Sequence, residues 1–431
     1  MRKKITTNQL RLGMYIQEFC GSWMDHPFWR SAFVLNASKD LQAIVDSRIT
    51  EVWIDTSKGL DVEQALPESS LPATAAVQTE QGAADVLASE WSFPAPAVHT
   101  VAHGEDAQRI EPSSMQQELL QAAEICRQSK QAVESMFHEA RMGKAVDATV
   151  ARQLVQDITD SVTRNSQALI SLARLKNADD YTYMHSVAVC ALMVALSRQL
   201  GLDPEQTRQA GMAGLMHDLG KAHIPLDILN KPGKLTPAEF DEVKKHPQEG
   251  YDILHSAGCT ESVVLDVCLH HHERVDGKGY PKGLDDSRIS LFAKMGAVCD
   301  VYDAITSNRP YKQGWDPAES LKQMASWAKG HFDQRVFQAF VKSLGIYPVG
   351  SLVRLQSGAI AVVVEQNPDN LTAPKVKKFF STKSDMRVPA ALVDLANPDA
   401  QDKIAFRENP STWKFPDLHA MWAGDAAPHV V

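Results

Sequence analysis

Histidines and aspartates of the kind that bind catalytic metals are concentrated in one part of this 431-residue chain. Eight of its fifteen histidines lie between His185 and His272, and in this stretch His217 is followed directly by Asp218. Neutral imidazoles and carboxylates are the ligands of catalytic divalent metals such as iron, manganese and zinc. A carboxylate has two oxygens and can bridge two ions, which together polarise a phosphoryl group and activate water. The pattern therefore indicates a hydrolytic metal site.

Charged residues near this cluster are candidates for contact with an anionic substrate. Lys221 stands one helical turn beyond His217, where its ammonium group could reach a substrate oxygen, although a solvated helix end is the plainer alternative. Asp300 and Asp303 are three residues apart and are therefore neighbours on one helix face. One could bind metal while the other contacts the substrate. Their apolar flanks disfavour the alternative of a surface position.

The elements that must position these residues are mostly helices. Apolar residues recur at steps of three and four between Asp147 and Leu175, which indicates an amphipathic helical stretch. Asp203-Pro204 and Thr236-Pro237 have the order of a helix cap followed by proline, and Gly201 is typical of a helix end. The sequence predicts a mainly α fold, with an all-α catalytic domain whose separate helices each carry one or two candidate ligands.

The chain is expected to have four parts: a small N-terminal regulatory domain at 1–62, a flexible linker at 63–112, the helical domain at 113–345, and a short β-rich extension with a tail at 346–431. The first part is predicted to be an α/β or β domain, because β-like segments occur at Leu12–Ile16 and Val52–Asp55. The second is rich in Ala, Pro, Ser, Gln and Glu and has few large apolar residues. In the last part, Leu352–Leu355 and Ala359–Glu365 have the pattern of strands around a turn.

Composition restricts the partners and the location. The chain has 44 Lys and Arg against 53 Asp and Glu, a formal net charge of −9, which argues against DNA, RNA or an anionic membrane as a partner. A local basic pocket for a small anion is still compatible with this total. The six cysteines are scattered without a C-x-x-C motif. The start of the chain has no apolar core of signal-peptide length, and the most apolar stretch, Val187–Leu196, is far too short for a membrane span. We therefore expect a cytoplasmic protein without membrane insertion.

Six blocks of sequence within residues 179–345 resemble the HD-GYP domains of the HD phosphohydrolase superfamily. In order they are Tyr181-Thr-Tyr-Met-His-Ser186, His217-Asp-Leu-Gly-Lys221, Lys231-Pro-Gly-Lys-Leu235, His246-Pro-Gln-Glu-Gly250, His271-His-Glu-Arg-Val-Asp-Gly-Lys-Gly-Tyr-Pro281 and Asp300-Val-Tyr-Asp-Ala-Ile-Thr-Ser-Asn-Arg-Pro-Tyr311. The first part of the chain, with Leu12-Gly-Met-Tyr15 and His26-Pro-Phe28, is similar to a small uncharacterised domain often found ahead of HD-GYP modules.

The resemblance implies a cyclic-guanylate-specific phosphodiesterase of bacterial signalling that hydrolyses cyclic di-GMP through attack by a metal-bridging hydroxide. It implies two divalent metal ions, iron or manganese first, with zinc, nickel and magnesium as further candidates. One ion would be held by His185, His217, Asp218 and Asp300, and the other by Asp218, His246, His271 and His272. Some family members bind three metals through a Glu at the position of Tyr181, so here we expect two metals and linear pGpG as the product, with GMP as the alternative.

The resemblance also implies the substrate contacts. Asp218 and Lys221 are the expected catalytic residues, and the expected substrate-binding residues are Lys221, Asp303, Arg309 and Lys312. The loop Gly279-Tyr280-Pro281 is associated with the entrance of the site and with contacts to GGDEF domains.

Several alternatives stay open at this point. The chain could be a weakly active or inactive receptor of cyclic di-GMP, or an HD hydrolase of another nucleotide, which the Gly-Tyr-Pro block disfavours. The N-terminal domain is expected to regulate the enzyme or to form a homodimer. Four other histidines are expected to be structural or at the surface, namely His26, His223, His255 and His270.

Overall fold

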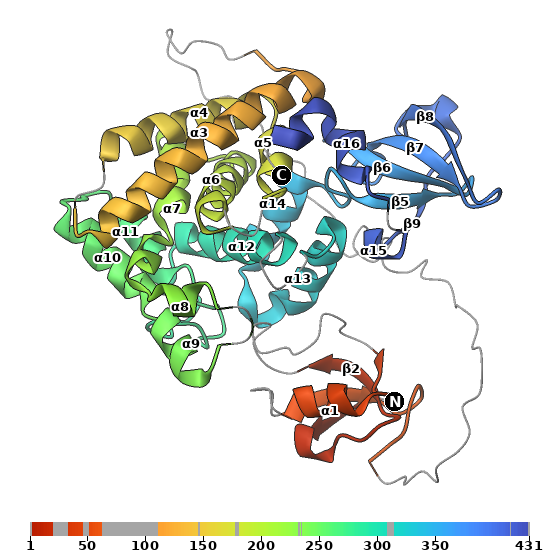
Figure 1. The fold of residues 1–431 in the computed structure, drawn as a ribbon, viewed down its shortest axis with the longest axis horizontal. Coiled ribbons are helices and arrows are strands. Elements are labelled where there is room, and N and C mark those ends of the chain that lie inside the picture. The colour runs from red at the N-terminus through yellow and green to blue at the C-terminus, as the bar shows by residue number, and fades with distance from the viewer. Residues whose placement is uncertain are drawn as a thin grey trace. The chain divides into compact units, whose positions relative to one another are not determined.

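The computed structural model describes residues 2–19, 33–45, 51–62, 111–144, 147–176, 181–231, 233, 235–307, 314–413 and 415–429. The chain divides into two compact units, Met1–Gln78 and Thr79–Val431, which are described separately below (Figure 1). The linker expected at 63–112 lies almost wholly outside the described residues.

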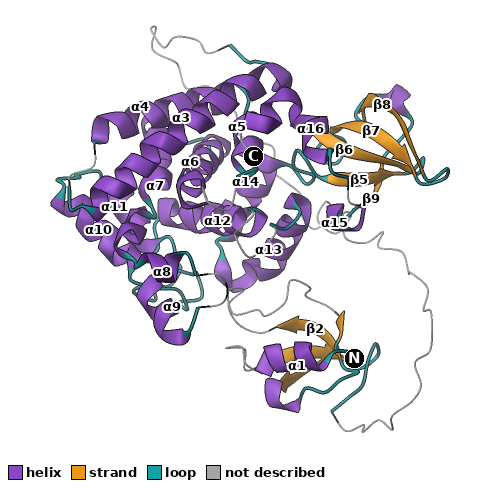
Figure 2. Cartoon of the chain, viewed as in Figure 1, coloured by secondary structure: helices purple, strands orange, loops and turns teal. Residues whose placement is uncertain are grey.

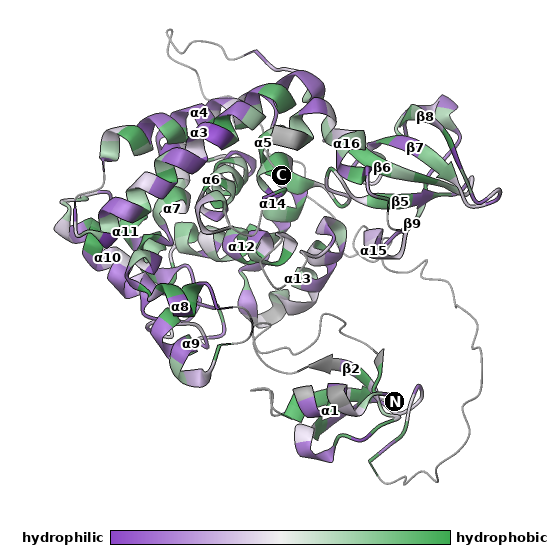
Figure 3. Ribbon diagram, viewed as in Figure 1, coloured by the Kyte–Doolittle hydropathy of each residue, from purple (hydrophilic) through white to green (hydrophobic). Residues whose placement is uncertain are grey.

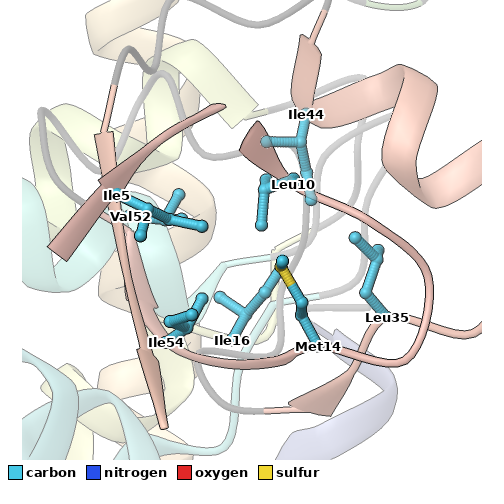
Figure 4. Packing of buried hydrophobic residues seen from close by; sticks show 8 residues of the cluster. All are labelled: Ile5, Leu10, Met14, Ile16, Leu35, Ile44, Val52 and Ile54. Carbon is cyan, nitrogen blue, oxygen red and sulfur yellow. The ribbon is translucent and has the colours of Figure 1, made fainter. Parts of the chain in front are cut away.

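The N-terminal unit contains an antiparallel four-stranded sheet with the order β1-β4-β2-β3. Its elements are β1 (Arg2–Thr6), η1 (Thr7–Gln9), β2 (Tyr15–Phe19), β3 (Phe33–Val34), α1 (Ser38–Val45) and β4 (Glu51–Asp55). Val52 and Ile54 of β4 are both buried, because alternate residues of a strand point to the same face. They join a cluster of Ile5, Leu10, Met14, Ile16, Leu35 and Ile44 (Figure 4). The expected small α/β domain is confirmed.

Helices build most of the C-terminal unit. They are α3 (Met115–Arg141), α4 (Ala148–Arg164), α5 (Ala168–Ala173), α6 (Tyr181–Gln199), α7 (Pro204–Met216), η3 (Leu219–His223), α8 (Leu226–Leu229), α9 (Pro237–Val243), α10 (His246–Ser256), α11 (Ser262–His270), α12 (Leu291–Thr306), α13 (Pro317–His331) and α14 (Gln334–Leu344). Other helices surround α6, which is buried continuously from Met184 to Leu196 (Figure 2). Hydrophobic residues predominate on the inner helix α12, whereas α9 is mostly hydrophilic (Figure 3). The predicted mainly α fold is confirmed.

A buried carboxylate joins the first two helices of this unit. The Glu118 side chain in α3 accepts hydrogen bonds from Arg164 Nε at 2.8 Å and from Ser161 Oγ at 2.7 Å, both in α4. The helical stretch expected over 147–175 is divided after Arg164, because Asn165 is extended and its side-chain oxygen accepts the amide hydrogens of Gln167 and Ala168. Such side-chain acceptors compete with the helical hydrogen bonds of the backbone.

The chain ends in a second antiparallel sheet with the order β8-β7-β6-β5-β9. Its strands are β5 (Leu352–Leu355), β6 (Ala359–Glu365), β7 (Lys375–Ser381), β8 (Met386–Asp394) and β9 (Ile404–Arg407), with η4 (Pro398–Ala400) before the last strand. Three short helices follow, namely α15 (Pro410–Trp413), α16 (Leu418–Ala423) and η5 (Gly424–His429). Helix α16 packs on β6, and η5 packs on α3. The β-rich extension is confirmed, and it is more ordered at its end than the expected tail.

No helix within these described ranges combines the length and the apolar character needed to cross a membrane.

Candidate metal centre

The seven expected metal ligands come from five places in the C-terminal unit and meet at one point. They are His185 in α6, His217 and Asp218 between α7 and η3, His246 at the start of α10, His271 and His272 after α11, and Asp300 in α12. Asp218 lies between two sides of the cluster, because its Oδ2 is 3.3 Å from His217 Nε2 and its Oδ1 is 3.2 Å from His246 Nε2. His185 Nε2 is 3.0 Å from Asp300 Oδ1. The side chain of His272 is 16% exposed and thus largely buried, and the other six are buried.

A close backbone approach brings His246 into the cluster. A β-carbon at Gly220 would lie 1.9 Å from the carbonyl oxygen of His246 and 2.5 Å from the amide nitrogen of Gly250. Only a glycine therefore allows η3 to pack this closely on the first turn of α10. The glycine of the His-Asp-Leu-Gly-Lys block is thus explained by packing.

Hydrogen bonds to the backbone orient three of the imidazole rings. The Nδ1 atoms of these rings donate to carbonyl oxygens, in His217 to Gly214 at 2.8 Å, in His246 to Val243 at 2.7 Å and in His271 to Val267 at 3.0 Å. A carbonyl can only accept, so Nδ1 carries the hydrogen and the lone pair of Nε2 points into the cluster. This is the tautomer that a metal ligand requires.

The Nε2 atoms in the cluster face one another. His217 Nε2 is 3.3 Å from His185 Nε2, and His246 Nε2 is 3.2 Å from His271 Nε2. Buried imidazole nitrogens at such distances repel unless a proton or a metal cation lies between them. The Oδ1 atom of Asp218 is also buried, and it accepts no hydrogen bond from the residues that the structure describes. The donor set therefore fits divalent cations, as the sequence predicts.

Ligand atoms that lie within 4.8 Å of one another form three groups. The groups are His185, His217 and Asp300; His246, His271 and His272; and His217, Asp218 and His271. The first two groups belong to different halves of the expected ligand set. Because the third joins Asp218 to one histidine from each half, the arrangement suits a carboxylate shared by two ions.

Burial and charge act in opposite directions on the ionisable groups of the cluster. Burial is the main cause that lowers the pKa of His272 to about 3, and burial with the neighbouring histidines holds the pKa of His271 well below 6.5. Burial alone would also lower the pKa of His185, but hydrogen bonds to nearby carboxylates outweigh it and raise that pKa to about 10. Burial opposes ionisation of Asp218 and Asp300, yet their cationic neighbours hold both pKa values well below 3.8. Both carboxylates are therefore ionised near neutral pH, the state in which they can bind a metal ion.

Comparison with known proteins places the chain in a family. Residues 2–151 match a domain of unknown function, DUF3391, and residues 151–336 match the HD domain. The chain is 51% identical over 425 residues to the cyclic di-GMP phosphodiesterase PA4108 of Pseudomonas aeruginosa, covering 98% of this chain and 96% of that protein. The chain belongs to the HD-GYP phosphodiesterase family. The resemblance noted in the sequence is thus confirmed, and the protein is an enzyme.

Other relatives match a smaller part of this HD-GYP protein. The cyclic di-GMP phosphodiesterase response regulator RpfG of Xanthomonas campestris is 36% identical over 198 residues, which is 45% of this chain and 52% of that protein. Among solved structures, Bd1817, an HDG"Y"P protein from Bdellovibrio bacteriovorus, aligns with a TM-score of 0.44 and 17% identity over 79% of this chain and 98% of its own.

The expected substrate-binding residues have three different outcomes in this HD-GYP domain. Lys221 lies at the cluster, because its Nζ donates to Asp218 Oδ2, and its side chain is 19% exposed. For Asp303, contact with the substrate stays a prediction, and the structure shows other partners for its carboxylate. It is buried behind His185, and both of its carboxylate oxygens accept hydrogen bonds from Lys176. Arg309 and Lys312 lie outside the described residues.

The Gly-Tyr-Pro loop of this HD-GYP protein packs directly on the cluster. The ring of Tyr280 stacks on that of His272, with ring centroids 4.6 Å apart. The buried Glu273 holds the loop, because its carboxylate accepts the amide hydrogens of Lys282 at 2.7 Å and Leu284 at 2.9 Å. The loop therefore packs against His272, an expected metal ligand, and the sequence alone does not predict this contact.

Residues expected to be structural stay out of the three ligand groups. His270 Nδ1 is 2.8 Å from Asp266 Oδ1, and His255 stacks on Tyr251. His223 is exposed, and its Nδ1 is 3.9 Å from Glu249 Oε2. His26 and the side chain of Tyr181 are outside what the structure describes.

Sequence reasoning missed Lys176 and Glu273, both of which support the cluster without joining it. Each is buried although its residue type is normally at the surface. A signal was present for Glu273, which follows the His-His pair directly. For Lys176 there was no such signal, because it stands among other charged residues after α5, two residues beyond Arg174.

Proposed function

We propose that this protein hydrolyses cyclic di-GMP to linear pGpG in bacterial second-messenger signalling. The name of the relative that matches nearly the whole chain supports this substrate. The observation that carries the proposal is the pair of facing imidazole contacts on either side of the Asp218 carboxylate. This geometry suits a two-metal phosphodiesterase.

Two divalent ions, iron or manganese, are proposed to occupy the cluster. One set of ligands is His185, His217, Asp218 and Asp300, and the other is Asp218, His246, His271 and His272. When bound, such ions polarise the phosphoryl group and lower the pKa of a water molecule. The protein holds its four buried histidines by hydrogen bonds that fix their tautomers, so little reorganisation is needed on binding.

Lys221 is the proposed substrate contact within the described residues. Its ammonium group is partly exposed beside Asp218, where it could stabilise negative charge on a phosphoryl oxygen in the transition state. Arg309 and Lys312 are proposed as further substrate contacts on the family resemblance alone.

Charge also favours a dianionic substrate. Asp218 and Asp300 carry two negative charges, so two divalent ions would leave an excess of positive charge, to which Lys221 adds. Cyclic di-GMP carries one negative charge on each of its two phosphodiester groups. A local positive pocket is thus compatible with the formal net charge of −9 of the whole chain.

Three finer statements remain predictions. They are contact with GGDEF domains through Gly279–Pro281, a homodimer, and a regulatory role of residues 1–62. Deletion of residues 1–110 tests the last of these, since unchanged activity, regulation and oligomeric state would remove it.

The test is hydrolysis by the full chain purified without oxygen and loaded with iron or manganese. We expect chromatography to show pGpG, and we expect Asp218→Asn to lower the rate by more than about 100-fold, because it alters the ligand shared by both halves. Asp252→Asn on the exposed face of α10 is the matched control and should retain the wild-type rate. Absence of hydrolysis with either metal, or full activity of Asp218→Asn, would overturn the proposal.

A further inference from the structure

Lys176 carries a charge in the interior of the C-terminal unit. Its side chain is 0% exposed, and that of its partner Asp303 is 3% exposed. Lys176 Nζ donates to Asp303 Oδ1 at 2.7 Å and to Oδ2 at 2.6 Å. A buried ammonium group is strongly unfavourable unless it is paired, so its position calls for an explanation.

The carboxylate of Asp303 connects Lys176 to the metal cluster. Asp303 Oδ2 is also 2.6 Å from His185 Nδ1. A lysine can only donate, so the ionised carboxylate accepts from both neighbours, and Nδ1 of His185 carries the hydrogen. Nε2 of that ring therefore faces the cluster, 3.0 Å from Asp300 Oδ1 and 3.3 Å from His217 Nε2, where a metal ion would displace its proton.

Lys176 also separates the roles of two aspartates on α12. Asp300 and Asp303 lie one turn apart, and both are within 3.0 Å of a nitrogen of His185. The ammonium group of Lys176 neutralises Asp303 and keeps its carboxylate on the outer side of the histidine ring. Asp300 is then free to act as a ligand.

We propose that Lys176 is a positioning residue for the half of the metal centre formed by His185, His217 and Asp300. It acts through Asp303, which orients His185, and it touches neither substrate nor metal. This inference rests on the proposed function in one respect, since it requires that the cluster binds metal. Residues that orient a metal-ligating histidine typically contribute 10–100-fold to metal affinity.

The effect should be confined to one half of the centre. The other half is oriented by different contacts, because Nδ1 of His246 and of His271 donate to backbone carbonyls. Loss of Lys176 should therefore weaken one metal-binding step and spare the other. A general loss of structure would weaken both.

The experiment is a titration of the metal-free full chain with Mn²⁺, with stepwise dissociation constants measured by competition with a chelator and by electron paramagnetic resonance. Lys176→Met keeps an unbranched side chain, one atom shorter than that of lysine, and removes its charge. We expect one dissociation constant to rise about 10–100-fold and the other to stay within about 3-fold. The control Lys294→Met breaks ion pairs with Asp286 and Asp333 at the start of α12 and should change neither constant.

A double variant distinguishes the proposed effect of Lys176 from a general loss of folded structure. Lys176→Met/Asp303→Asn removes both buried charges and keeps an oxygen that can accept from His185 Nδ1. We expect it to melt at a higher temperature than Lys176→Met and to recover part of the lost affinity. Three results would each overturn the inference. The first is a folded Lys176→Met variant with unchanged Mn²⁺ dissociation constants, and the second is an equal rise of both constants in both variants. The third is a wild type that binds no Mn²⁺. A wild type that binds two ions but does not cleave cyclic di-GMP would overturn only the proposed function.

Discussion

The buried carboxylate of Glu118 offers a sharp test of how the first two helices of the C-terminal unit are held together. Its side chain is 0% exposed and accepts two hydrogen bonds from Arg164, at 2.8 and 2.9 Å, and one each from Ser161 and Ser113. Glu118→Gln keeps the shape but removes the charge, and its amide hydrogens would face these donors. Breaking a buried pair from one side costs about 3–5 kcal/mol. Because Arg164 is 24% exposed and regains water, we expect a loss of about 2–3 kcal/mol.

The assay is thermal or urea unfolding followed by the helical circular dichroism signal. A loss of this size should lower the melting temperature by roughly 3–6 °C in a unit of this length. Glu124→Gln is the matched control, because Glu124 lies on the same helix and pairs with Arg127 while the two side chains are 51% and 54% exposed. Exposed pairs contribute little, so the control should melt like the wild type.

The pH dependence supplies a second check on Glu118. Burial alone would raise the pKa of this carboxyl, but the hydrogen bonds from Arg164, Ser161 and Ser113 outweigh burial and bring the pKa below 4.5. A lowered pKa in the folded state gives stabilisation that is complete above the unfolded pKa and is lost as the pH falls through the folded one. The stability gap between wild type and Glu118→Gln should be constant near neutral pH and shrink below about pH 4.5. Equal losses in Glu118→Gln and Glu124→Gln, or a gap that widens in acid, would refute the reasoning.

Three further outcomes are expected. Gly220→Ala should weaken metal binding in a dialysis assay by pushing back the His246 backbone, whereas Gly143→Ala, with nothing within 4 Å of the added carbon, should leave it unchanged. Tyr280→Ala should lower the hydrolysis rate by about 10–100-fold because it removes the ring stacked on His272, and Tyr280→Phe, which keeps that ring, should retain most of it. Removal of metal by a chelator should lower the melting temperature of the C-terminal unit, by an amount equivalent to about 2.7 kcal/mol if the ion had been present at 100 times its dissociation constant. Equal behaviour of the paired variants, or an unchanged melting temperature after chelation, would contradict these expectations.

Local signals in the sequence predicted local structure well. Asp203 and Thr236 cap the helices that begin at Pro204 and Pro237, each with a reciprocal pair of cap hydrogen bonds. Gly201 follows α6 with a φ of 74°, a backbone conformation that favours glycine. These features depend on a few neighbouring residues, so the order of residue types suffices to predict them.

Contacts between distant residues were beyond such reasoning. Asp303 was expected to meet the substrate because it shares a helix face with Asp300, yet the partner that decides its role is Lys176, 127 residues away. The stacking of Tyr280 on His272 likewise depends on how a loop folds back over the preceding helix. A spacing pattern shows which residues share a face, but the charge or ring that covers this face comes from tertiary packing.

The contact between η5 and α3 has a consequence for synthesis of the chain. The ribosome adds about 5–20 residues per second, so α3, complete at Arg141, exists for on the order of tens of seconds before Gly424–His429 is made. The strands of the N-terminal sheet are all made once β4 at Glu51–Asp55 is complete, so this sheet can form early. The C-terminal unit, in contrast, completes this packing only after Gly424–His429 has been translated, and loss of this segment would leave a surface of helix α3 uncovered.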